Sequence, residues 1–337
     1  MKVAIIGATG YTGLELIKIL VNHPEFKITY IANSTGEQNV NELHPCLQNV
    51  LSMPVSKANA VEVAVNAKLA FLALPHQTSM GFAKELLELG IKVVDLSADY
   101  RLELETYEKH YCPHIDKENL PNAVYGMPEY YKEEIKNAKL VANPGCYPTA
   151  TLLGLLPFVP YIDENIPVFV DAKSGVSGAG KKISEATTFC NINENIFAYN
   201  PFKHRHMPEI QEKVLKIKHK ELNINFVPHL INATRGMLVS TYVTLKEDID
   251  PQEIQEILRK AYKNSPFIRI KDKPVDIKST AGTNFCDIFV AKNGKALFIN
   301  TSIDNLLKGA SSAAVANANL MCGFDEALGV PNIAYMP

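Results

Sequence analysis

The stretch KVAIIGATGYTG, residues 2–13, decides the fold. A short apolar run ends at Ile6, glycines follow at positions 7, 10 and 13, and apolar residues then recur at helical spacing from Leu14 to Val21. A glycine turn between a strand and a helix brings backbone N–H groups close to a pyrophosphate. The glycine spacing alone is weak evidence, but its place directly after the first strand is the required context. We therefore predict a dinucleotide site, with a bare structural turn as the alternative, at Gly7, Thr9, Gly10, Tyr11, Thr12 and Gly13.

Strands and helices keep alternating through the first 142 residues. Strands are predicted at residues 2–6, 27–32, 69–74, 91–96 and 140–142, with a helix over 81–89. Strands that alternate with helices of this length indicate a parallel sheet covered on both faces. We therefore predict an α/β fold whose first domain, residues 1–145, is a Rossmann-type dinucleotide-binding domain.

After Cys146 the pattern changes. Extended runs are predicted at 167–172, 224–229, 236–245, 267–270, 285–291 and 296–301, with helices over 147–156 and 250–262. The last two runs are joined across Asn293-Gly294, a strong hairpin signal. Strands in runs with few crossover helices indicate an α+β domain over 146–304 on a mainly antiparallel sheet. A final helix over about 305–321 is predicted to complete the first domain, with the chain to 337.

The composition excludes several classes of protein. Lys and Arg number 34 against 36 Asp and Glu, so no nucleic-acid partner is expected, because nucleic-acid binders carry a basic patch. No stretch approaches 18 uninterrupted apolar residues and no signal-peptide core is found, so no membrane partner is expected. The cysteines, at 46, 112, 146, 190, 286 and 322, are too sparse for a disulfide scaffold and lack zinc-site spacing. We expect a cytoplasmic protein with reduced thiols and no metal.

The end of the second predicted strand indicates which nicotinamide cofactor is used. NAD-binding proteins place an acidic residue there to hold the ribose 2′-hydroxyl. Here the sequence reads Ala32-Asn33-Ser34-Thr35-Gly36, with no acid before Glu37. Hydroxyl groups tolerate a 2′-phosphate that a carboxylate would repel, so we predict NADP.

Cys146 is the candidate nucleophile. It follows Asn143-Pro144-Gly145 and begins an apolar predicted helix. The N–H groups at a helix N-terminus favour an anion, so a thiolate is stabilised there. The alternative for any single cysteine is a buried, inert side chain, and we assign that alternative to the other five.

The segment 204–209, HRHMPE, is the second candidate for catalysis. Pro208 fits the first position of a helix, which places His206 just before it. The positive end of the helix dipole opposes protonation there, and a neutral imidazole suits proton transfer. A surface pair of histidines is the alternative. Metal sites at His204 and His206, or at 110–114, lack enough ligands at usable spacing.

A loop of Ser, Gly and Lys over residues 171–182 leaves two interpretations open. Its backbone amides could bind an anion, or it could be a flexible surface loop.

Together these segments resemble the N-acetyl-γ-glutamyl-phosphate reductases, which have a semialdehyde dehydrogenase-like fold. The resemblance covers essentially the whole chain and rests on GATGYTG (7–13), FLALPHQTS (71–79), DLSADYRL (95–102), YGMPE (125–129), ANPGCYPTA (142–150), DAKSGVSGAGKK (171–182), HRHMPEI (204–210), PHLINATRGML (228–238) and IDNLLKGASSAAVANANLMCGFDE (303–326). One departure is that Asn33-Ser34-Thr35 lacks a basic residue often found there in the family.

The resemblance implies a role for each matching position. It implies Cys146 as nucleophile and His206 as acid/base. Beyond the glycine turn, the residues implied to bind the dinucleotide are Ser34, Pro75, Ser174, Gly175, Asn305 and Lys308. Those implied to lie near the substrate are Arg101, Asn143, Lys181, His204, Arg205 and Glu209.

The implied activity is an oxidoreductase step of arginine biosynthesis. NADPH reduces N-acetyl-γ-glutamyl phosphate to N-acetylglutamate 5-semialdehyde and phosphate through a cysteine thioester, which divides one hard step into two. A homodimer or homotetramer is implied as well. The alternatives are an enzyme like aspartate-semialdehyde dehydrogenase, or a non-catalytic NADP-binding sensor.

Overall fold

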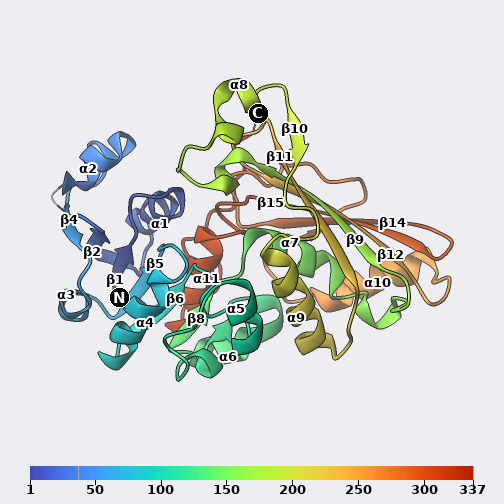
Figure 1. The fold of residues 1–337 in the computed structure, drawn as a ribbon, viewed down its shortest axis with the longest axis horizontal. Coiled ribbons are helices and arrows are strands. Elements are labelled where there is room, and N and C mark those ends of the chain that lie inside the picture. Colours follow the sequence, from blue (N-terminus) through green and yellow to red (C-terminus); the bar gives the residue numbers. More distant parts are fainter. Residues whose placement is uncertain (37, 337) are drawn as a thin grey trace. The chain divides into compact units, whose positions relative to one another are not determined.

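The computed structural model describes residues 1–36 and 38–336 and divides into two compact units (Figure 1). The first unit is Met1–Pro144 with Ala310–Pro331, and the second is Gly145–Gly309 with the residues from Asn332 onward. Each unit is built on one sheet.

The first unit contains an eight-stranded sheet with the order β3-β4-β2-β1-β5-β6-β8-β7. Its elements are β1 (Lys2–Ile6), α1 (Tyr11–Val21), β2 (Lys27–Asn33), β3 (Gln38–Asn39), α2 (Val40–Leu43), β4 (Pro54–Lys57), α3 (Ala60–Asn66), β5 (Leu69–Leu72), α4 (Thr78–Glu88), β6 (Lys92–Asp95), α5 (Leu104–His110), β7 (Val124–Tyr125), α6 (Pro128–Asn137), β8 (Leu140–Ala142) and α11 (Ser311–Met321). The strand pairs are parallel except for β3 with β4. The predicted parallel sheet is therefore confirmed.

Helices cover both faces of this sheet, as β1 illustrates. Ala4 and Ile6 belong to a buried cluster with residues of α3 and α4, including Val63 and Leu86. Successive residues of a strand point to opposite faces, so Ile5, which is fully buried, faces the other layer. There α1 packs against α11, and α11 packs against α6.

The second unit contains a seven-stranded sheet with the order β10-β11-β9-β12-β15-β14-β13. Its elements are α7 (Cys146–Leu155), β9 (Val168–Gly175), α8 (Phe189–Ile192), β10 (Ile196–Ala198), α9 (His206–Lys218), β11 (Ile224–Ile231), β12 (Met237–Thr244), α10 (Pro251–Ala261), β13 (Ile268–Ile270), β14 (Cys286–Asn293) and β15 (Ala296–Ile303). Parallel pairing joins β9 to β11 and β13 to β14, and the other pairs are antiparallel. The mainly antiparallel sheet and the hairpin at Asn293-Gly294 are confirmed.

One face of the seven-stranded sheet is covered by helices. Helix α7 packs on β12 and β15, and α10 packs on β14. A Cβ at Gly154 would lie 2.7 Å from Cγ2 of Thr301, so glycine is required where α7 meets β15. This covered face positions α7 and with it the nucleophile.

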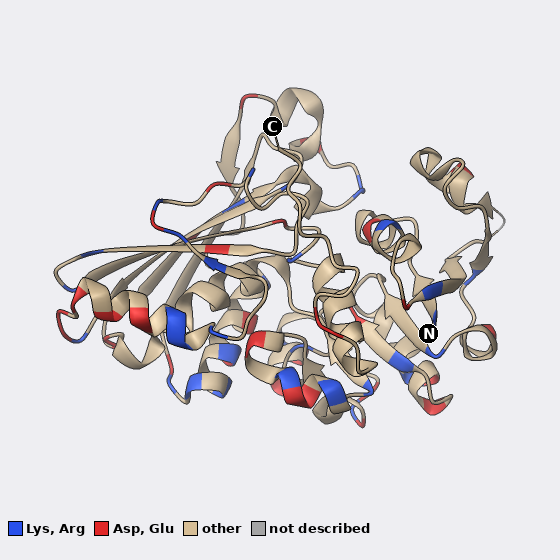
Figure 2. Cartoon of the chain, turned by 180° about the vertical axis from the view of Figure 1, so that it is seen from behind, with Lys and Arg blue, Asp and Glu red and all other residues tan. Residues whose placement is uncertain are grey.

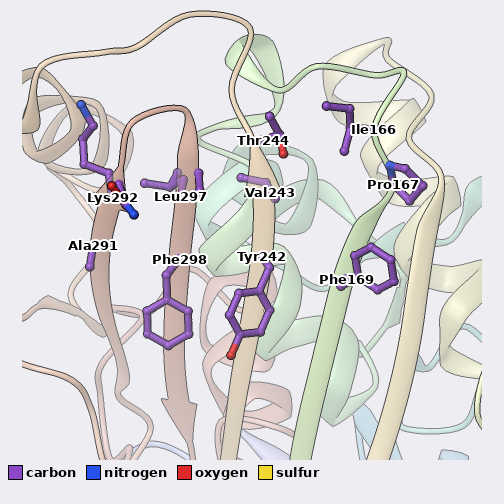
Figure 3. Close-up of a pocket in the computed structure, with 12 residues that line it drawn as sticks. Ile166, Pro167, Phe169, Tyr242, Val243, Thr244, Ala291, Lys292, Leu297 and Phe298 are labelled. Atoms are coloured by element: carbon purple, nitrogen blue, oxygen red, sulfur yellow. The ribbon is translucent and has the colours of Figure 1, made fainter.

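The opposite face carries an exposed row of apolar side chains. Phe169, Tyr242, Phe298 and Ala291 are direct partners on the neighbouring strands β9, β12, β15 and β14. Phe169 is 51% exposed and Tyr242 is 49% exposed, and Figure 3 shows the three aromatic rings side by side. We call Phe169, Tyr242, Phe298 and Ala291 the aromatic row.

Two helices begin at other residues than predicted. Helix α4 begins at Thr78, not at residue 81, because the Asp99 carboxylate accepts hydrogen bonds from the N–H groups of Gln77 and Met80. Helix α11 begins at Ser311, not near residue 305. Before it, the Asp304 carboxylate accepts from the N–H groups of Leu306 and Leu307 and holds that segment as a turn.

Acidic and basic residues are interspersed along the helices in Figure 2, as a formal net charge of −2 predicts. Among the described residues, no helix is both long and apolar enough to cross a membrane.

Candidate active site

Cys146 is the first residue of α7, in the second unit, and its side chain is partly exposed. Gly145 precedes it in extended conformation, with φ −69° and ψ 154°. The next nine residues of α7 are buried, which fixes the direction of the helix. A Cβ at Gly309 would lie 2.7 Å from Cβ of Cys146, so glycine leaves room for the thiol-bearing residue. The thiol therefore sits at the N-terminus of a rigid helix, where an anion is favoured.

Glu209 links α9 to the start of α7. Its carboxylate is buried and accepts a hydrogen bond of 3.1 Å from the backbone N–H of Gly145. An unpaired buried N–H costs about 1–3 kcal/mol, so this bond holds the residue before the nucleophile in place. Glu209, which was predicted to lie near the substrate, thus positions the backbone of Gly145.

His206 is the first residue of α9, so the helix begins two residues earlier than Pro208 suggests. The rings of His206 and Tyr147 lie edge to face, with centroids 5.9 Å apart. Tyr147 directly follows Cys146, so His206 contacts the residue next to the predicted nucleophile. The fold therefore brings both to one region of the second unit.

His204 orients the start of the same helix. Its Nδ1 accepts a hydrogen bond of 3.1 Å from the backbone N–H of His206. Burial, helped by the positive charge of Arg205, lowers the pKa of His204 to about 4. The His204 ring is therefore neutral at physiological pH, and its proton is on Nε2 because Nδ1 is an acceptor.

Tyr199 is a residue of this region that the sequence analysis missed. Its hydroxyl lies 3.0 Å from the hydroxyl of Tyr147, and its ring contacts His204. Burial raises the pKa of Tyr199 to about 12 and also raises the pKa of Tyr147, so both phenols stay protonated near neutral pH. No spacing in the sequence relates the two tyrosines, because each is held by β11: the N–H of Tyr199 donates to the carbonyl of Pro228, and the hydroxyl of Tyr147 donates to the carbonyl of His229.

A cavity of about 370 Å³ lies beside His204 in the second unit. Its lining residues include Tyr199, Asn200, Lys203 and Arg205, together with parts of the segment 178–187. Two cations and no carboxylate are among the lining residues described, so the cavity favours an anionic group.

The predicted dinucleotide turn is so closely packed that two of its three glycines leave no room for a side chain. Gly7 has φ +95°, and a Cβ there would lie 2.2 Å from the carbonyl oxygen of Ala73. A Cβ at Gly13 would lie 2.4 Å from the carbonyl oxygen of Gly7, whereas nothing lies within 4 Å of the Cβ position of Gly10. Gly10 precedes α1, whose first turn carries no acid and includes Tyr11 and Thr12. These residues fit a dinucleotide phosphate at the helix N-terminus.

Two other predicted cofactor residues lie in the first unit. Ser34 is exposed in a turn where Oδ1 of Asn33 accepts from the N–H groups of Thr35 and Gly36. Pro75 precedes α4, in the turn that the Asp99 carboxylate holds.

The remaining predicted cofactor residues lie in the second unit. Asn305 accepts from the N–H of Gly236 and donates to Oγ of Ser177. A Cβ at Gly178 would lie 2.7 Å from Oγ of Ser174, so Ser174, Gly175 and Asn305 belong to one closely packed region. Lys308 is buried, with its ammonium 5.8 Å from the ring centroid of Phe267. The part of the 171–182 loop around Ser174 is thus packed, whereas Lys181 is exposed.

Arg101 and Asn143 have structural contacts in the first unit. Arg101 is buried and donates to the carbonyl oxygens of Asn143 and Leu96. Asn143 donates from Nδ2 to the carbonyl of Ala310 and accepts from Asn317. Both side chains therefore fix the chain segment that leads to Gly145 and Cys146.

The prediction that the other five cysteines are buried is confirmed only for Cys286. Cys46 and Cys190 are exposed, Cys112 and Cys322 are partly exposed, and Cys286 is buried. Cys46 lies in a single helical turn over Pro45–Leu47 and Cys190 lies in the four-residue α8, both of them short elements outside the two sheets. No group of three potential metal ligands was found among the described residues.

The chain matches known families along most of its length. Residues 2–138 match the family model of the semialdehyde dehydrogenase NAD binding domain, and residues 146–305 match that of the semialdehyde dehydrogenase dimerisation domain. A protein of Sulfurovum sp. (strain NBC37-1) named N-acetyl-gamma-glutamyl-phosphate reductase is 64% identical, over 100% of both chains. One of the same name from Wolinella succinogenes is 58% identical, over 100% of this chain and 99% of its own.

Solved structures show the same fold at low sequence identity. Aspartate semialdehyde dehydrogenase II of Vibrio cholerae has a TM-score of 0.71 at 18% identity, over 96% of this chain and 98% of its own. Aspartate semialdehyde dehydrogenase of Candida albicans, solved with NADP, has a TM-score of 0.73 at 15% identity, over 95% of this chain and 98% of its own. The chain belongs to the semialdehyde dehydrogenase family of oxidoreductases and, within it, to the N-acetyl-gamma-glutamyl-phosphate reductases.

Proposed function

We propose that the protein reduces N-acetyl-γ-glutamyl phosphate with NADPH, giving N-acetylglutamate 5-semialdehyde and phosphate. The step belongs to arginine biosynthesis and takes place in the cytoplasm. The observation that carries the proposal is the position of Cys146 at the start of buried α7, where the ring of the next residue, Tyr147, contacts His206. The full-length relatives named for this reaction support the choice of substrate.

In the first half-reaction, Sγ of Cys146 attacks the acyl carbon of the substrate. The bond from that carbon to the phosphate oxygen breaks, and phosphate leaves with the electron pair. The N–H groups at the start of α7 stabilise the attacking thiolate, and Glu209 holds Gly145 so that these groups keep their direction.

In the second half-reaction, the dinucleotide held by the glycine turn at residues 7–13 would supply a hydride to the carbonyl carbon of the thioester. His206 donates a proton to the carbonyl oxygen as the thiohemiacetal forms and takes it back as the C–S bond breaks. The aldehyde leaves, and the electron pair of the C–S bond returns to Cys146 as thiolate. His204 supports this role by accepting the N–H of His206 and remaining neutral.

The cavity beside His204 supports an anionic substrate. Lys203 and Arg205 line it, and the N-acetylglutamyl group carries a carboxylate beside the reacting acyl group. In the first unit, the exposed hydroxyls of Ser34 and Thr35 favour NADP over NAD, because residues 33–36 include no carboxylate to repel a 2′-phosphate.

The purified protein tests this function directly in the reverse direction. N-acetylglutamate semialdehyde is expected to reduce NADP only when phosphate is present, and faster than it reduces NAD. Turnover of aspartate semialdehyde in its place would keep the mechanism and reject the substrate. The absence of turnover with both aldehydes would favour a cofactor-binding sensor instead.

We also propose that the aromatic row pairs with a second copy of the chain. The row lies inside the segment that matches a dimerisation domain, and its aromatic side chains lie on neighbouring strands, on the face opposite to the one that α7 covers. Aromatic side chains are enriched in protein interfaces because they bury large areas with little loss of conformational entropy. Pairing through this face gives a homodimer, and two such dimers give a homotetramer.

Replacing Tyr242 by arginine is expected to raise the dimer dissociation constant at least about 100-fold, because an unpaired charge would be buried at the interface. Molar mass measured by light scattering over a dilution series tests this. The matched control is Val61→Arg, at a 63% exposed position on α3 of the first unit, which is expected to leave the mass unchanged. A Tyr242→Arg protein with the wild-type mass at every concentration would contradict the proposed interface.

A further inference from the structure

We propose that Lys57, at the end of β4, binds the 2′-phosphate of NADP and sets the preference for this cofactor. The inference rests on the proposed use of NADP. It supplies the basic residue that this turn lacks, because residues 33–36 carry hydroxyl groups but no cation to attract a phosphate.

The register of the sheet places Lys57 beside the turn predicted to hold the 2′-phosphate. Strand β4 pairs in parallel with β2, and Lys57 is the direct partner of Asn33. The N–H of Ala58 donates to the carbonyl of Asn33, so the pairing continues beyond the last residue of β4. Figure 1 shows β4 next to β2 in the first unit. Lys57 is therefore about 5 Å from Asn33 in backbone position, the usual spacing of neighbouring strands.

Lys57 and Asn33 point to the same face of the sheet. Tyr30 and Ala32 of β2 pack in the cluster with α3 and α4, so Asn33 points to the opposite face. Partners in a parallel pair share a face, so the side chain of Lys57 also points to the side of Asn33. There Oδ1 of Asn33 binds the N–H groups of Thr35 and Gly36.

The turn over residues 33–36 contacts the backbone of Lys57 directly. A Cβ at Gly36 would lie 2.7 Å from the backbone nitrogen of Lys57, so the backbones of turn and strand are in close contact. Gly36 has φ +75°, which glycine adopts without strain. The exposed Ser34 and Thr35 and the exposed Lys57 are thus parts of one small surface.

Glu62, an acidic residue near the strand pair, binds another side chain and does not face Lys57. Glu62 accepts a hydrogen bond of 2.9 Å from the hydroxyl of Tyr30, on the face that packs against α3 and α4. The Lys57 ammonium extends from the other face of the strand pair. A phosphate dianion beside Ser34 would therefore have the Lys57 ammonium and the Ser34 hydroxyl as donors, whereas the Thr35 hydroxyl donates to Oδ1 of Asn33.

Replacing Lys57 by methionine tests the inference while keeping the length of the side chain. Adenosine 2′,5′-bisphosphate is the probe for the 2′-phosphate, and 5′-AMP is the probe without it, both measured by titration calorimetry. We expect Lys57→Met to weaken the bisphosphate about 10-fold, because a charge-assisted hydrogen bond is lost, and to change 5′-AMP less than about 2-fold. The ratio of kcat/KM for NADPH over NADH is expected to fall by the same factor.

Two control variants test whether the loss of bisphosphate affinity comes from the positive charge at position 57. Lys57→Arg keeps the charge and is expected to retain the bisphosphate affinity within about 3-fold. Lys27→Met removes an exposed charge at the other end of β2 and is expected to change neither affinity. Because the contact is exposed, the preference of the wild-type protein for the bisphosphate is expected to fall with added salt more steeply than that of Lys57→Met.

The outcomes separate this inference from the proposed function. A wild-type protein that binds both probes equally, or prefers NADH, would reject the use of NADP and Lys57 with it. A wild-type preference for NADP that survives Lys57→Met unchanged would overturn the role of Lys57 alone. An equal loss for both probes would also overturn it, since the variant would then have disturbed the whole turn.

Discussion

Replacing Cys146 by serine is expected to lower kcat of phosphate-dependent NADP reduction at least about 10⁴-fold, because the chemistry then lacks its nucleophile. A serine hydroxyl is not ionised near neutral pH, whereas a thiol at a helix N-terminus supplies a thiolate. Serine is slightly smaller than cysteine and fits beside Gly309, where space is limiting. The loss is measured in the reverse assay with N-acetylglutamate semialdehyde, phosphate and NADP.

Two controls separate the lost nucleophile from a damaged protein. The melting temperature and the affinity for NADP of Cys146→Ser are expected to equal those of the wild type. Cys190→Ser, which changes an exposed cysteine on α8 of the same unit, is expected to keep full activity. A Cys146→Ser protein that retained a tenth of the wild-type kcat would show that another group attacks the substrate.

Replacing His206 by asparagine is expected to lower kcat about 10²–10⁴-fold, the usual contribution of a general acid/base. Asparagine has a similar size and keeps hydrogen bonding at the start of α9, but it transfers no proton. The main role assigned to His206 is proton transfer and not activation of the thiol. Extra thiolate alone gains little, because the nucleophilicity of a thiolate falls as its pKa falls.

The rate of alkylation of Cys146 distinguishes these roles, followed by mass spectrometry of the Cys146 peptide. In His206→Asn this rate is expected to stay within about 3-fold of the wild type, since the N–H groups of α7 remain. The matched control is His219→Asn at the other end of α9, where the residue has φ +53° and asparagine is well tolerated. If His206→Asn had a normal hydride-transfer rate but a much lower rate of Cys146 alkylation, the main role of His206 would be activation of the thiol and not proton transfer.

Much of the fold could be predicted because it depends on local patterns. Strands β1 and β8 have the predicted bounds, since apolar runs between turn residues define buried strands. The starts of α4 and α11 could not be predicted from such runs. They depend on the carboxylates of Asp99 and Asp304, and Asp99 is 22 residues away from the N–H of Gln77 that it binds.

The candidate site divides in the same way. Cys146 and His206 could be selected because each stands at a helix start that the local sequence marks with glycine or proline. Tyr199 and Lys57 could not, because contacts between segments far apart in the sequence give each of them its neighbours. The contacts of Glu209 and Arg101 with the backbone before Cys146 could not be predicted either, and the family resemblance implied substrate contacts for both residues.

The two exposed cysteines have a consequence for covalent inhibitors. An electrophile designed for Cys146 meets a partly exposed thiol, while Cys46 and Cys190 are freely accessible to the same reagent. Reactivity alone would therefore consume the compound at sites that do not stop the enzyme. The cavity lined by Lys203 and Arg205 is also lined by Tyr199, whose hydroxyl lies 3.0 Å from that of Tyr147, the residue after Cys146. An anionic recognition group matched to the two cations is therefore expected to direct the compound to Cys146 better than intrinsic electrophilicity does.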